Sequence, residues 1–334
     1  MNEMNEQNFR SDPLKLEIKE EYKINCTPYY FDNQFIFVNS IKYKDNFLIF
    51  SSNNWKNLTF YSFNLKEIIQ VFVNLFDNDI ILSIRYFMNN STDYILTTSN
   101  NKVRIYIISE EGLKEYLSFE KIFDGPKSFI YSCCLLFTKE LNYIIVSTGN
   151  TKHYLKVLNM DTSKVAKEVH DNNYIYFVDT YNKEKDIFLL LGTESNGVNV
   201  FNFTQNKLYN CFLELNDSSS HYSAIIRKNV LIESCDWGFI RIWDFDKKEL
   251  KNKINMNCKV LGIILWNDNY LFVSNCGKPY KIKLADLEKG ENIKKYKGHK
   301  GNIISFQKIL HPIYGESLLS ISSDKTIKVW SSKY

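Results

Sequence analysis

The sequence predicts an all-β protein made of internal repeats, and three observations carry this prediction. Aromatic residues make up 15% of the 334 residues, including 22 Tyr and 24 Phe, and large aromatic side chains favour strands. Alanine, the residue with the highest helix propensity, occurs only three times. Short apolar runs that end in a bulky residue also recur about every 45 residues along the chain.

Two segments near the C-terminus show the repeat most clearly. The last one, YKGHKGNIISFQKILHPIYGESLLSISSDKTIKVW, holds Gly298 and His299, two strand-like runs, a tight turn and a third strand that ends at Trp330. The segment HYSAIIRKNVLIESCDWGFIRIWDF has the same order, from His221 to Trp243. Both segments resemble the WD-repeat family, also called WD40 or β-transducin-like. The repeat of that family is a four-stranded blade of a β-propeller.

The other repeats are located from the bulky residue that takes the place of these tryptophans, which we call the anchor. The candidate anchors are Tyr61, Tyr106, Leu158, Phe201 and Lys283. With the two tryptophans they stand at intervals of 45, 52, 43, 42, 40 and 47 residues. This spacing predicts seven blades. Lys and Arg residues two places before the anchors are expected to lie along the neighbouring blade and to reach water with their charged ends.

The two ends of the chain predict how the ring closes. The last blade, which ends at Trp330, lacks its outer strand, and residues 14–24, LKLEIKEEYKI, alternate between apolar and polar side chains. We expect this N-terminal strand to pair with the last blade, because such closure removes an exposed sheet edge. The predicted organisation is a disordered tail at residues 1–13 and a single seven-bladed WD-repeat β-propeller at residues 14–334.

The resemblance also implies a hydrogen-bonded blade network in the last repeat. In the family, a His, a Ser or Thr, an Asp and the Trp brace the blade, and the matching residues are His299, Ser320 or Ser322, Asp324 and Trp330. Ser, His and Asp are also the residue types of a hydrolase triad. The resemblance favours the structural brace.

The fifth repeat departs from this pattern. His221 and Trp243 match the network, but Trp237 takes the place of the Asp and Asp236 stands one residue early. We therefore expect no complete network in this blade.

No motif indicates an enzyme, a cofactor or a metal site. The sequence holds no P-loop, no G-x-G-x-x-G and no H-E-x-x-H, and its five His residues are scattered. The seven Cys include no C-x-x-C pair, so we expect free thiols in a reducing compartment, in the cytoplasm or the nucleus. The polar start MNEMNEQNFRSD does not resemble a secretory signal, and no apolar run reaches the length of a membrane span.

Charge gives one local signal. The net charge of +4 is small for this length and does not favour nucleic acid. Residues 278–308, however, hold nine lysines, with Lys294, Lys295 and Lys297 as candidate contacts for an acidic partner or phosphate. Because the whole chain has 37 Lys and only 5 Arg, we favour the interpretation that these lysines are solvated surface residues.

The first functional hypothesis is a non-catalytic protein-interaction scaffold, a monomeric propeller that is a subunit of a multi-protein assembly. Trp55 in SSNNWKN and Trp237 in CDWGF are candidate partner contacts, because aromatic anchors dominate binding energy. A packed structural role remains an alternative for both. A second hypothesis is a binder of nucleic acid or anionic lipid through the lysine-rich blades six and seven, and a third is an enzyme with a site in the central channel.

Overall fold

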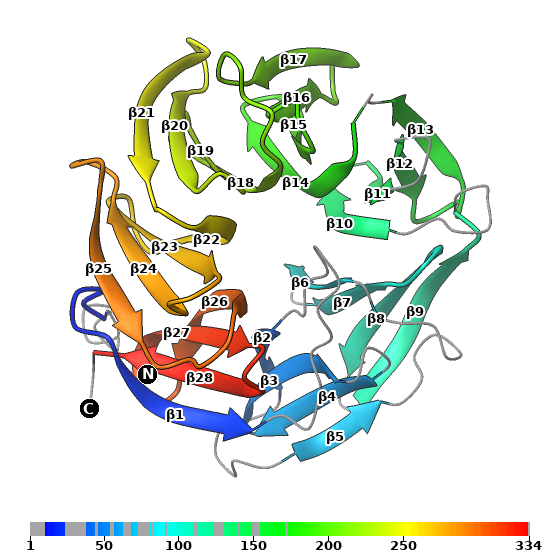
Figure 1. The fold of residues 1–334 in the computed structure, drawn as a ribbon. Helices are drawn as coiled ribbons and strands as arrows, with labels where there is room; N and C mark the ends of the chain where they lie inside the picture. Colours follow the sequence, from blue (N-terminus) through cyan, green and yellow to red (C-terminus); the bar gives the residue numbers. More distant parts are fainter. Residues whose placement is uncertain are drawn as a thin grey trace.

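The computed structural model is a ring of β-sheets set around a central channel (Figure 1). It describes residues 11–23, 38–43, 46–53, 57–62, 68–72, 81, 83–90, 92–109, 112–122, 130–138, 140–148, 154–170 and 173–332. No helix in this described part of the chain is long and apolar enough to cross a membrane.

The described strands pair into seven four-stranded antiparallel sheets, numbered here along the chain. Sheets one to three are β2 (Val38–Tyr43), β3 (Asn46–Asn53), β4 (Asn57–Ser62) and β5 (Ile68–Phe72); β6 (Ser83–Asn89), β7 (Thr92–Thr98), β8 (Lys102–Ser109) and β9 (Gly112–Glu120); and β10 (Ile130–Phe137), β11 (Asn142–Thr148), β12 (Tyr154–Asn159) and β13 (Val165–His170). Sheets four and five are β14 (Ile175–Lys183), β15 (Asp186–Thr193), β16 (Val198–Asn202) and β17 (Lys207–Phe212); and β18 (His221–Arg227), β19 (Val230–Cys235), β20 (Phe239–Asp244) and β21 (Glu249–Asn255). Sheets six and seven are β22 (Lys259–Leu265), β23 (Tyr270–Cys276), β24 (Lys281–Asp286) and β25 (Glu291–Lys297); and β26 (Ile303–His311), β27 (Gly315–Ser322), β28 (Thr326–Ser331) and β1 (Glu17–Lys23).

A β-bulge marks the anchor position in each of the first six sheets, where the third strand pairs with the fourth. In five of them the bulge falls on the anchor predicted from the sequence: Tyr61, Tyr106, Leu158, Phe201 and Trp243. In sheet six it falls on Ala285, so the prediction of Lys283 as an anchor is wrong. That prediction required a bulky side chain, whereas the small Ala285 lies in an apolar cluster with Ile254 and Met256 of sheet five.

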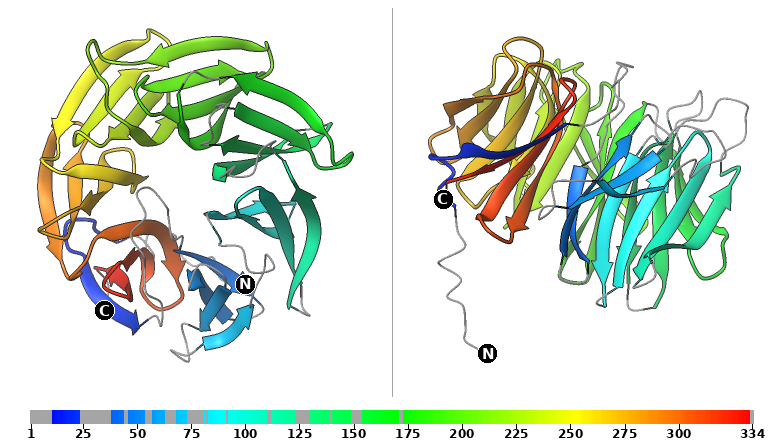
Figure 2. Two further views of the ribbon diagram at one scale, coloured as in Figure 1. Left: turned by 45° about the vertical axis from the view of Figure 1, so that its right-hand side comes forward. Right: turned by 90° about the horizontal axis from the view of Figure 1, so that it is seen from below.

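Sheet seven joins the two ends of the described chain. Its fourth strand is the N-terminal β1, which pairs with β28 and sets Ile18 opposite Trp330. Figure 2 shows β1, in blue, at the outer edge beside β28, in red. The strand begins at Glu17 and not at the predicted residue 14, because Pro13 and Leu14 form a turn.

Residues 11–13, which the sequence places in the tail, pack against sheets six and seven. Ser11 is 5% exposed, and its Oγ lies 3.0 Å from Oγ of Ser331. The indole N–H of Trp266 donates to the carbonyl of Ser11 at 3.3 Å, and the hydroxyl of Tyr296 donates to the carbonyl of Pro13. The packed part of the N-terminal segment therefore includes Ser11, while residues 1–10 lie outside the described residues.

The core lies between neighbouring sheets, as expected when each sheet covers the face of the next. Trp243 packs with Phe212 of sheet four at a ring separation of 5.8 Å, and Trp330 packs with Tyr296 of sheet six at 6.3 Å. Each anchor tryptophan thus fills the interface with the preceding sheet. The prediction of an all-β propeller is confirmed.

Candidate interaction face

Two kinds of connection emerge on one face of the ring, because the strands of every sheet are antiparallel. They are the turns from the second strand of a sheet to the third, and the segments that lead to the next sheet. The two kinds touch: the N–H of Ser220 donates to Oδ1 of Asp236 at 3.1 Å in sheet five, and the N–H of Lys300 donates to Oδ2 of Asp324 at 2.7 Å in sheet seven. We call this surface the loop face.

In sheet seven the structure brings the four proposed network residues together. The indole N–H of Trp330 donates to Oγ of Ser320 at 2.8 Å, and the same Oγ lies 2.8 Å from Nε2 of His299. Nδ1 of His299 lies 3.0 Å from Oδ2 of Asp324. Ser320 rather than Ser322 takes the serine position, since Oγ of Ser322 accepts from the N–H of Asp324 at 3.2 Å.

The environment of these residues favours a brace over a hydrolase triad. Ser320 is fully buried and His299 is 7% exposed, so the hydroxyl has no open side on which a substrate could be attacked. Burial alone would raise the pKa of Asp324, but hydrogen bonds from His299, Thr326 and the N–H of Lys300 outweigh it and hold that pKa well below its usual range. Asp324 is therefore a charged acceptor that fixes the turn.

In sheet five, His221 and Trp243 do not join in such a network. Nδ1 of His221 lies 2.9 Å from Oε2 of Glu233, and its Nε2 lies 3.4 Å from Oδ2 of Asp217. Within the described part of the chain, the buried indole N–H of Trp243 has no hydrogen-bond partner. The tryptophan therefore acts in this sheet through packing alone.

Glu233 explains the difference between the two sheets. It stands where Ser320 stands in sheet seven, since each pairs with the residue two places before its anchor tryptophan. The two carboxylate oxygens of Glu233 face Nδ1 of His221 and Nη1 of Arg241, whereas the Ser320 hydroxyl accepts from the indole N–H of Trp330. Both ring nitrogens of His221 face carboxylates, so the ring carries two protons. Burial alone would lower the pKa of His221, but Asp217 and Glu233 outweigh it and raise the pKa to about 9.

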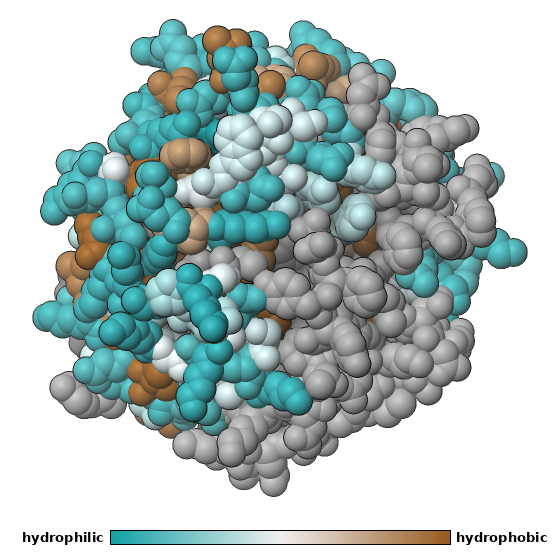
Figure 3. Space-filling view, in the orientation of Figure 1, coloured by the Kyte–Doolittle hydropathy of each residue, from teal (hydrophilic) through white to brown (hydrophobic). Residues whose placement is uncertain are grey.

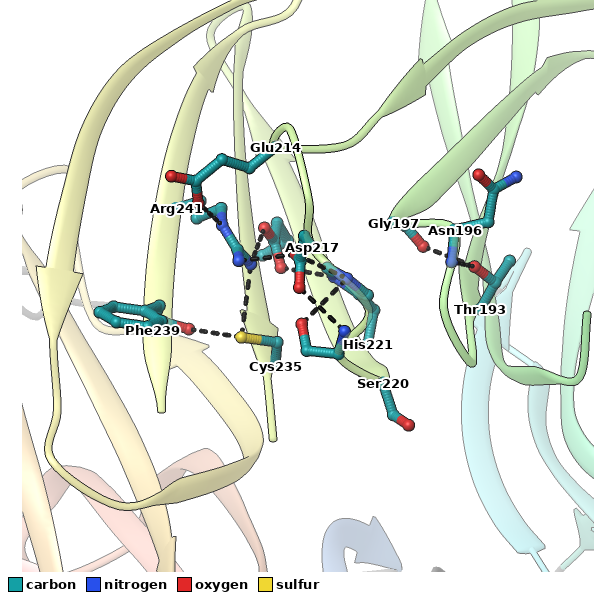
Figure 4. Close-up of polar contacts among 12 residues, drawn as sticks. Thr193, Asn196, Gly197, Glu214, Asp217, Ser220, His221, Cys235, Phe239 and Arg241 are labelled. Atoms are coloured by element: carbon teal, nitrogen blue, oxygen red, sulfur yellow. Dashed lines mark hydrogen bonds and ion pairs between the residues drawn. The ribbon is translucent and has the colours of Figure 1, made fainter. Parts of the chain in front are cut away.

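Arg241 is the second cation of this cluster (Figure 4). Its guanidinium reaches three carboxylates: Nε lies 2.8 Å from Glu214, Nη2 lies 2.6 Å from Asp217 and Nη1 lies 3.0 Å from Glu233. Nζ of Lys253 adds a contact of 2.7 Å with Glu214. Two of the carboxylates come from the connection between sheets four and five, and the third from β19. The cluster therefore ties a loop-face connection to the body of sheet five.

Two of the basic residues two places before the anchors do not reach water as expected, whereas Arg104 and Lys156 at the same position are partly exposed. Arg241 is 1% exposed and Lys328 is 4% exposed. Nζ of Lys328 pairs with Glu21 of β1, just as Arg241 pairs with Glu233. In sheets five and seven the position is buried, and each charge there needs a partner close by.

Trp237 projects from the loop face on a rigid turn. It is 53% exposed, although the next residue, Gly238, is buried and adopts φ = 83°. A Cβ at Gly238 would lie 2.5 Å from the carbonyl oxygen of Cys258, so this turn requires glycine. The N–H of Gly238 donates to the carbonyl of Cys235 at 3.1 Å. The other tryptophan candidate, Trp55, lies outside the described residues.

A row of tyrosines lines the channel near this face, and the sequence analysis missed it. Tyr131, Tyr176 and Tyr222 each sit at a bulge near the start of an inner strand, in sheets three, four and five. Their rings are 5.7 Å and 5.2 Å apart in that order, and Nζ of Lys259 lies 5.1 Å from the ring of Tyr222. Figure 3 has the orientation of Figure 1, and residues of intermediate hydropathy, shown pale, gather there over β14 and β18. The signal was present in the spacing of 45 and 46 residues between these tyrosines.

The tyrosines border a cavity of about 380 Å³ between the inner strands. Arg85 crosses it: its Nη1 lies 3.7 Å from Asp179, and its Nη2 donates to Ser132 Oγ at 3.2 Å and to the carbonyl of Val178 at 3.2 Å. These contacts hold the inner strands of sheets two to four together. Within the described residues, no group of three or more His, Cys, Asp or Glu side chains is placed to hold a metal ion.

Several lysines of the 278–308 stretch serve the fold. Lys283 is 5% exposed and donates to the carbonyl of Met256. Lys294 donates to a carbonyl of the N-terminal segment and lies 5.2 Å from the ring of Tyr296. Lys308 donates to the carbonyl of Trp266 at 2.8 Å. Lys294 is therefore engaged at a closure contact.

The exposed lysines of this stretch are dispersed over the surface. Lys278 and Lys300 lie in loop-face connections, Lys289 lies in the turn between β24 and β25 on the opposite face, and Lys295 and Lys297 lie on the outer strand β25. They therefore lie on both faces of the ring and along its outer edge.

Comparison with known proteins shows which family model and which solved structures this chain resembles. The family described as "WD domain, G-beta repeat" matches residues 290–331, which span β25 to β28. A comparison with curated proteins gives no match.

Two similar solved structures are described as crystal structures of BBS1N in complex with ARL6DN, soaked with lead and with mercury. The first has a TM-score of 0.73 at 9% identity and covers 95% of this chain and 97% of that chain. The second has a TM-score of 0.70 at 8% identity and covers 96% and 97%. At this identity the likeness shows the fold alone. The repeat match over β25 to β28 and the propeller fold together support a WD40-type β-propeller.

Proposed function

We propose that this chain is a non-catalytic protein-interaction scaffold, a WD-repeat subunit of a multi-protein assembly. A propeller presents loops on a rigid disc, and its function lies in the surfaces that those loops form. The similar structures named above are described as a complex of two proteins, which supports a protein partner here as well.

The observation that carries this proposal is the exposed Trp237 on a fixed base. Two hydrogen bonds between Ser220 and Asp236 anchor its turn. The N–H of Asp236 donates to the carbonyl of Ser220 at 3.0 Å, and the N–H of Ser220 donates to Oδ1 of Asp236 at 3.1 Å. The buried ions around Arg241 hold the adjoining connection. A large aromatic side chain on a backbone that is already fixed loses less entropy on binding than one on a flexible loop, which is the property of a hot-spot residue. We therefore place the partner on the loop face over sheet five.

The scaffold that we propose is a single closed, seven-bladed disc, monomeric within its assembly. The seven four-stranded sheets and the pairing of β1 with β28 support this arrangement. We also propose a reducing cytoplasmic setting. The five cysteines with described side chains, which are all free thiols, are consistent with it: Cys133, Cys134, Cys211, Cys235 and Cys258.

The alternative, a binder of nucleic acid or anionic lipid, draws no support from the placement of the lysines. A surface of this kind needs cations on one face, whereas Lys289 and Lys300 lie on opposite faces and Lys294 is engaged by the N-terminal segment. Lys295 and Lys297 on β25 remain its candidate contacts.

A native pull-down of the full-length protein with mass spectrometry, at low and high salt, tests the proposal. We expect a stoichiometric set of proteins that survives high salt and is lost from Trp237→Ala. Tyr116→Ala is the matched control, because Tyr116 is 52% exposed but lies on the outer strand β9. Equal loss from both variants would contradict the loop-face assignment. Recovery of nucleic acid or lipid only, and only at low salt, would contradict the scaffold.

A further inference from the structure

Lys283 and Cys258 form a pair that no function described above uses. Nζ of Lys283 lies 3.0 Å from Sγ of Cys258 and also donates to the carbonyl of Met256. The lysine is 5% exposed. Among the described residues, these two atoms are the hydrogen-bond partners of its amino group.

At the same position in the neighbouring sheets, the basic residue is paired with a carboxylate, and Lys283 has no such partner among the described residues. Lys283 stands two residues before the anchor Ala285, as Arg241 and Lys328 stand before their anchors. Arg241 and Lys328 are paired with carboxylates, whereas the described neighbour of Lys283 that can take a negative charge is the Cys258 sulfur. A buried cation is stabilised by a counter-charge, and an adjacent ammonium stabilises a thiolate.

Cys211 has the opposite surroundings and similar exposure. Its Sγ lies 3.0 Å from the carbonyl oxygen of Asn196 and 3.7 Å from Oδ1 of the same residue. Both atoms are acceptors, so they favour the protonated thiol as a donor. Cys211 and Cys258 are both partly exposed, while Cys133, Cys134 and Cys235 are buried.

Cys258 is partly exposed. It belongs to the connection from sheet five to sheet six on the loop face. Its carbonyl oxygen is the atom that a Cβ on Gly238 would strike, so its backbone packs against the turn that carries Trp237. A group added to Cys258 would therefore stand beside the surface of that turn.

From this geometry we propose that Cys258 is a site of oxidation by hydrogen peroxide, activated by Lys283. The Cys258 thiolate attacks one peroxide oxygen; an S–O bond forms while the O–O bond breaks. The sulfur is oxidised by two electrons to sulfenic acid and the peroxide is reduced. The leaving hydroxide takes a proton from the Lys283 ammonium and departs as water, and solvent then reprotonates the lysine.

Site-resolved labelling of the full-length protein tests this inference. Hydrogen peroxide is added at pH 7 in the presence of dimedone, which traps sulfenic acids, and the labelling rate of each cysteine is read by peptide mass spectrometry. Rates are normalised to those of the protein unfolded in guanidinium. We expect Cys258 to react at least about tenfold faster than Cys211. Equal rates would overturn the proposal.

Two variants separate the role of Lys283 from a change in total charge. Lys283→Met is expected to bring the rate of Cys258 down to that of Cys211, whereas Lys295→Met removes the same charge from the residue paired with Lys283 on β25 and should leave the rate unchanged. An unchanged rate in Lys283→Met would refute the activation. If that variant fails to fold, the rate of iodoacetamide alkylation in the unaltered protein at pH 7 decides. Cys258 should react faster than Cys211, and an equal or lower rate would overturn the proposal.

Discussion

His221 should make the stability of this propeller depend on pH in a way that one substitution removes. Its two ring nitrogens face the carboxylates of Glu233 and Asp217 at 2.9 and 3.4 Å, and the Arg241 guanidinium binds the same two carboxylates. The ring is protonated in the folded state, where its pKa is raised to about 9 from the ordinary value of 6.5. Replacement by Gln keeps a polar side chain but removes the charge.

The sign and size of the effect follow from these two pKa values. A folded-state pKa above the unfolded value means that the protonated ring stabilises the fold below pH 6.5, and that this contribution is lost as the pH rises towards 9. The difference between the two values corresponds to about 3 kcal/mol of unfolding free energy. About 2 kcal/mol of it remains at pH 7.5, where the folded ring is still protonated.

Urea unfolding followed by circular dichroism at pH 6, 7.5, 9 and 10 measures this contribution. The free energy of unfolding of the unaltered protein minus that of His221→Gln should fall by about 3 kcal/mol between pH 6 and pH 10. His311→Gln is the control: His311 is also buried, but it faces one carboxylate, that of Glu20 at 3.6 Å, and its Nδ1 accepts from the N–H groups of residues 313 and 314. A difference that stays constant with pH for His221→Gln would refute the doubly protonated ring.

Two further substitutions test the buried polar contacts of sheets seven and five. Ser320→Ala removes the acceptor of the buried Trp330 indole, so the free energy of unfolding should fall by about 2 kcal/mol; a loss below about 0.5 kcal/mol in urea unfolding would show that the network does not brace the sheet. Arg241→Met removes one of the two cations, Arg241 and His221, beside the buried carboxylates of Asp217 and Glu233 and should cost about 4 kcal/mol in the same assay. A neutral outcome for this substitution would mean that His221 alone balances the carboxylates.

The sequence predicted the ring well because its strongest signal, the anchor spacing, follows directly from the repeat. The anchors Tyr61, Leu158 and Phe201 show little likeness to Trp330 as residue types, yet each one falls on the bulge of its third strand. The assignment failed at Ala285, where side-chain size was used as the criterion. Size is a weak criterion because the neighbouring sheet can supply the missing volume.

A better criterion lies one residue further along the chain. The residue after the anchor in sheets three to six is Asn or Asp, and its Oδ1 accepts the N–H groups of the following turn: Asn159, Asn202, Asp244 and Asp286. Such a side chain closes a turn between strands by a local hydrogen bond, so the signal is readable from sequence. Applied to KIKLAD, this rule selects Ala285 as the anchor and excludes Lys283.

The position two residues before the anchor shows where sequence reasoning ends. Arg241, Lys283 and Lys328 occupy equivalent places and all are basic and buried, yet their partners are Glu233, the Cys258 sulfur and Glu21. These partners come from an adjacent strand, a loop between sheets and the far end of the chain. Local spacing specifies that a cation is placed there, but the folded ring determines its counter-charge. The chemistry of the position can therefore differ from sheet to sheet while the repeat is kept. In sheet six the Cys258 thiol takes the place of a carboxylate, so this is the sheet in which we expect chemical reactivity.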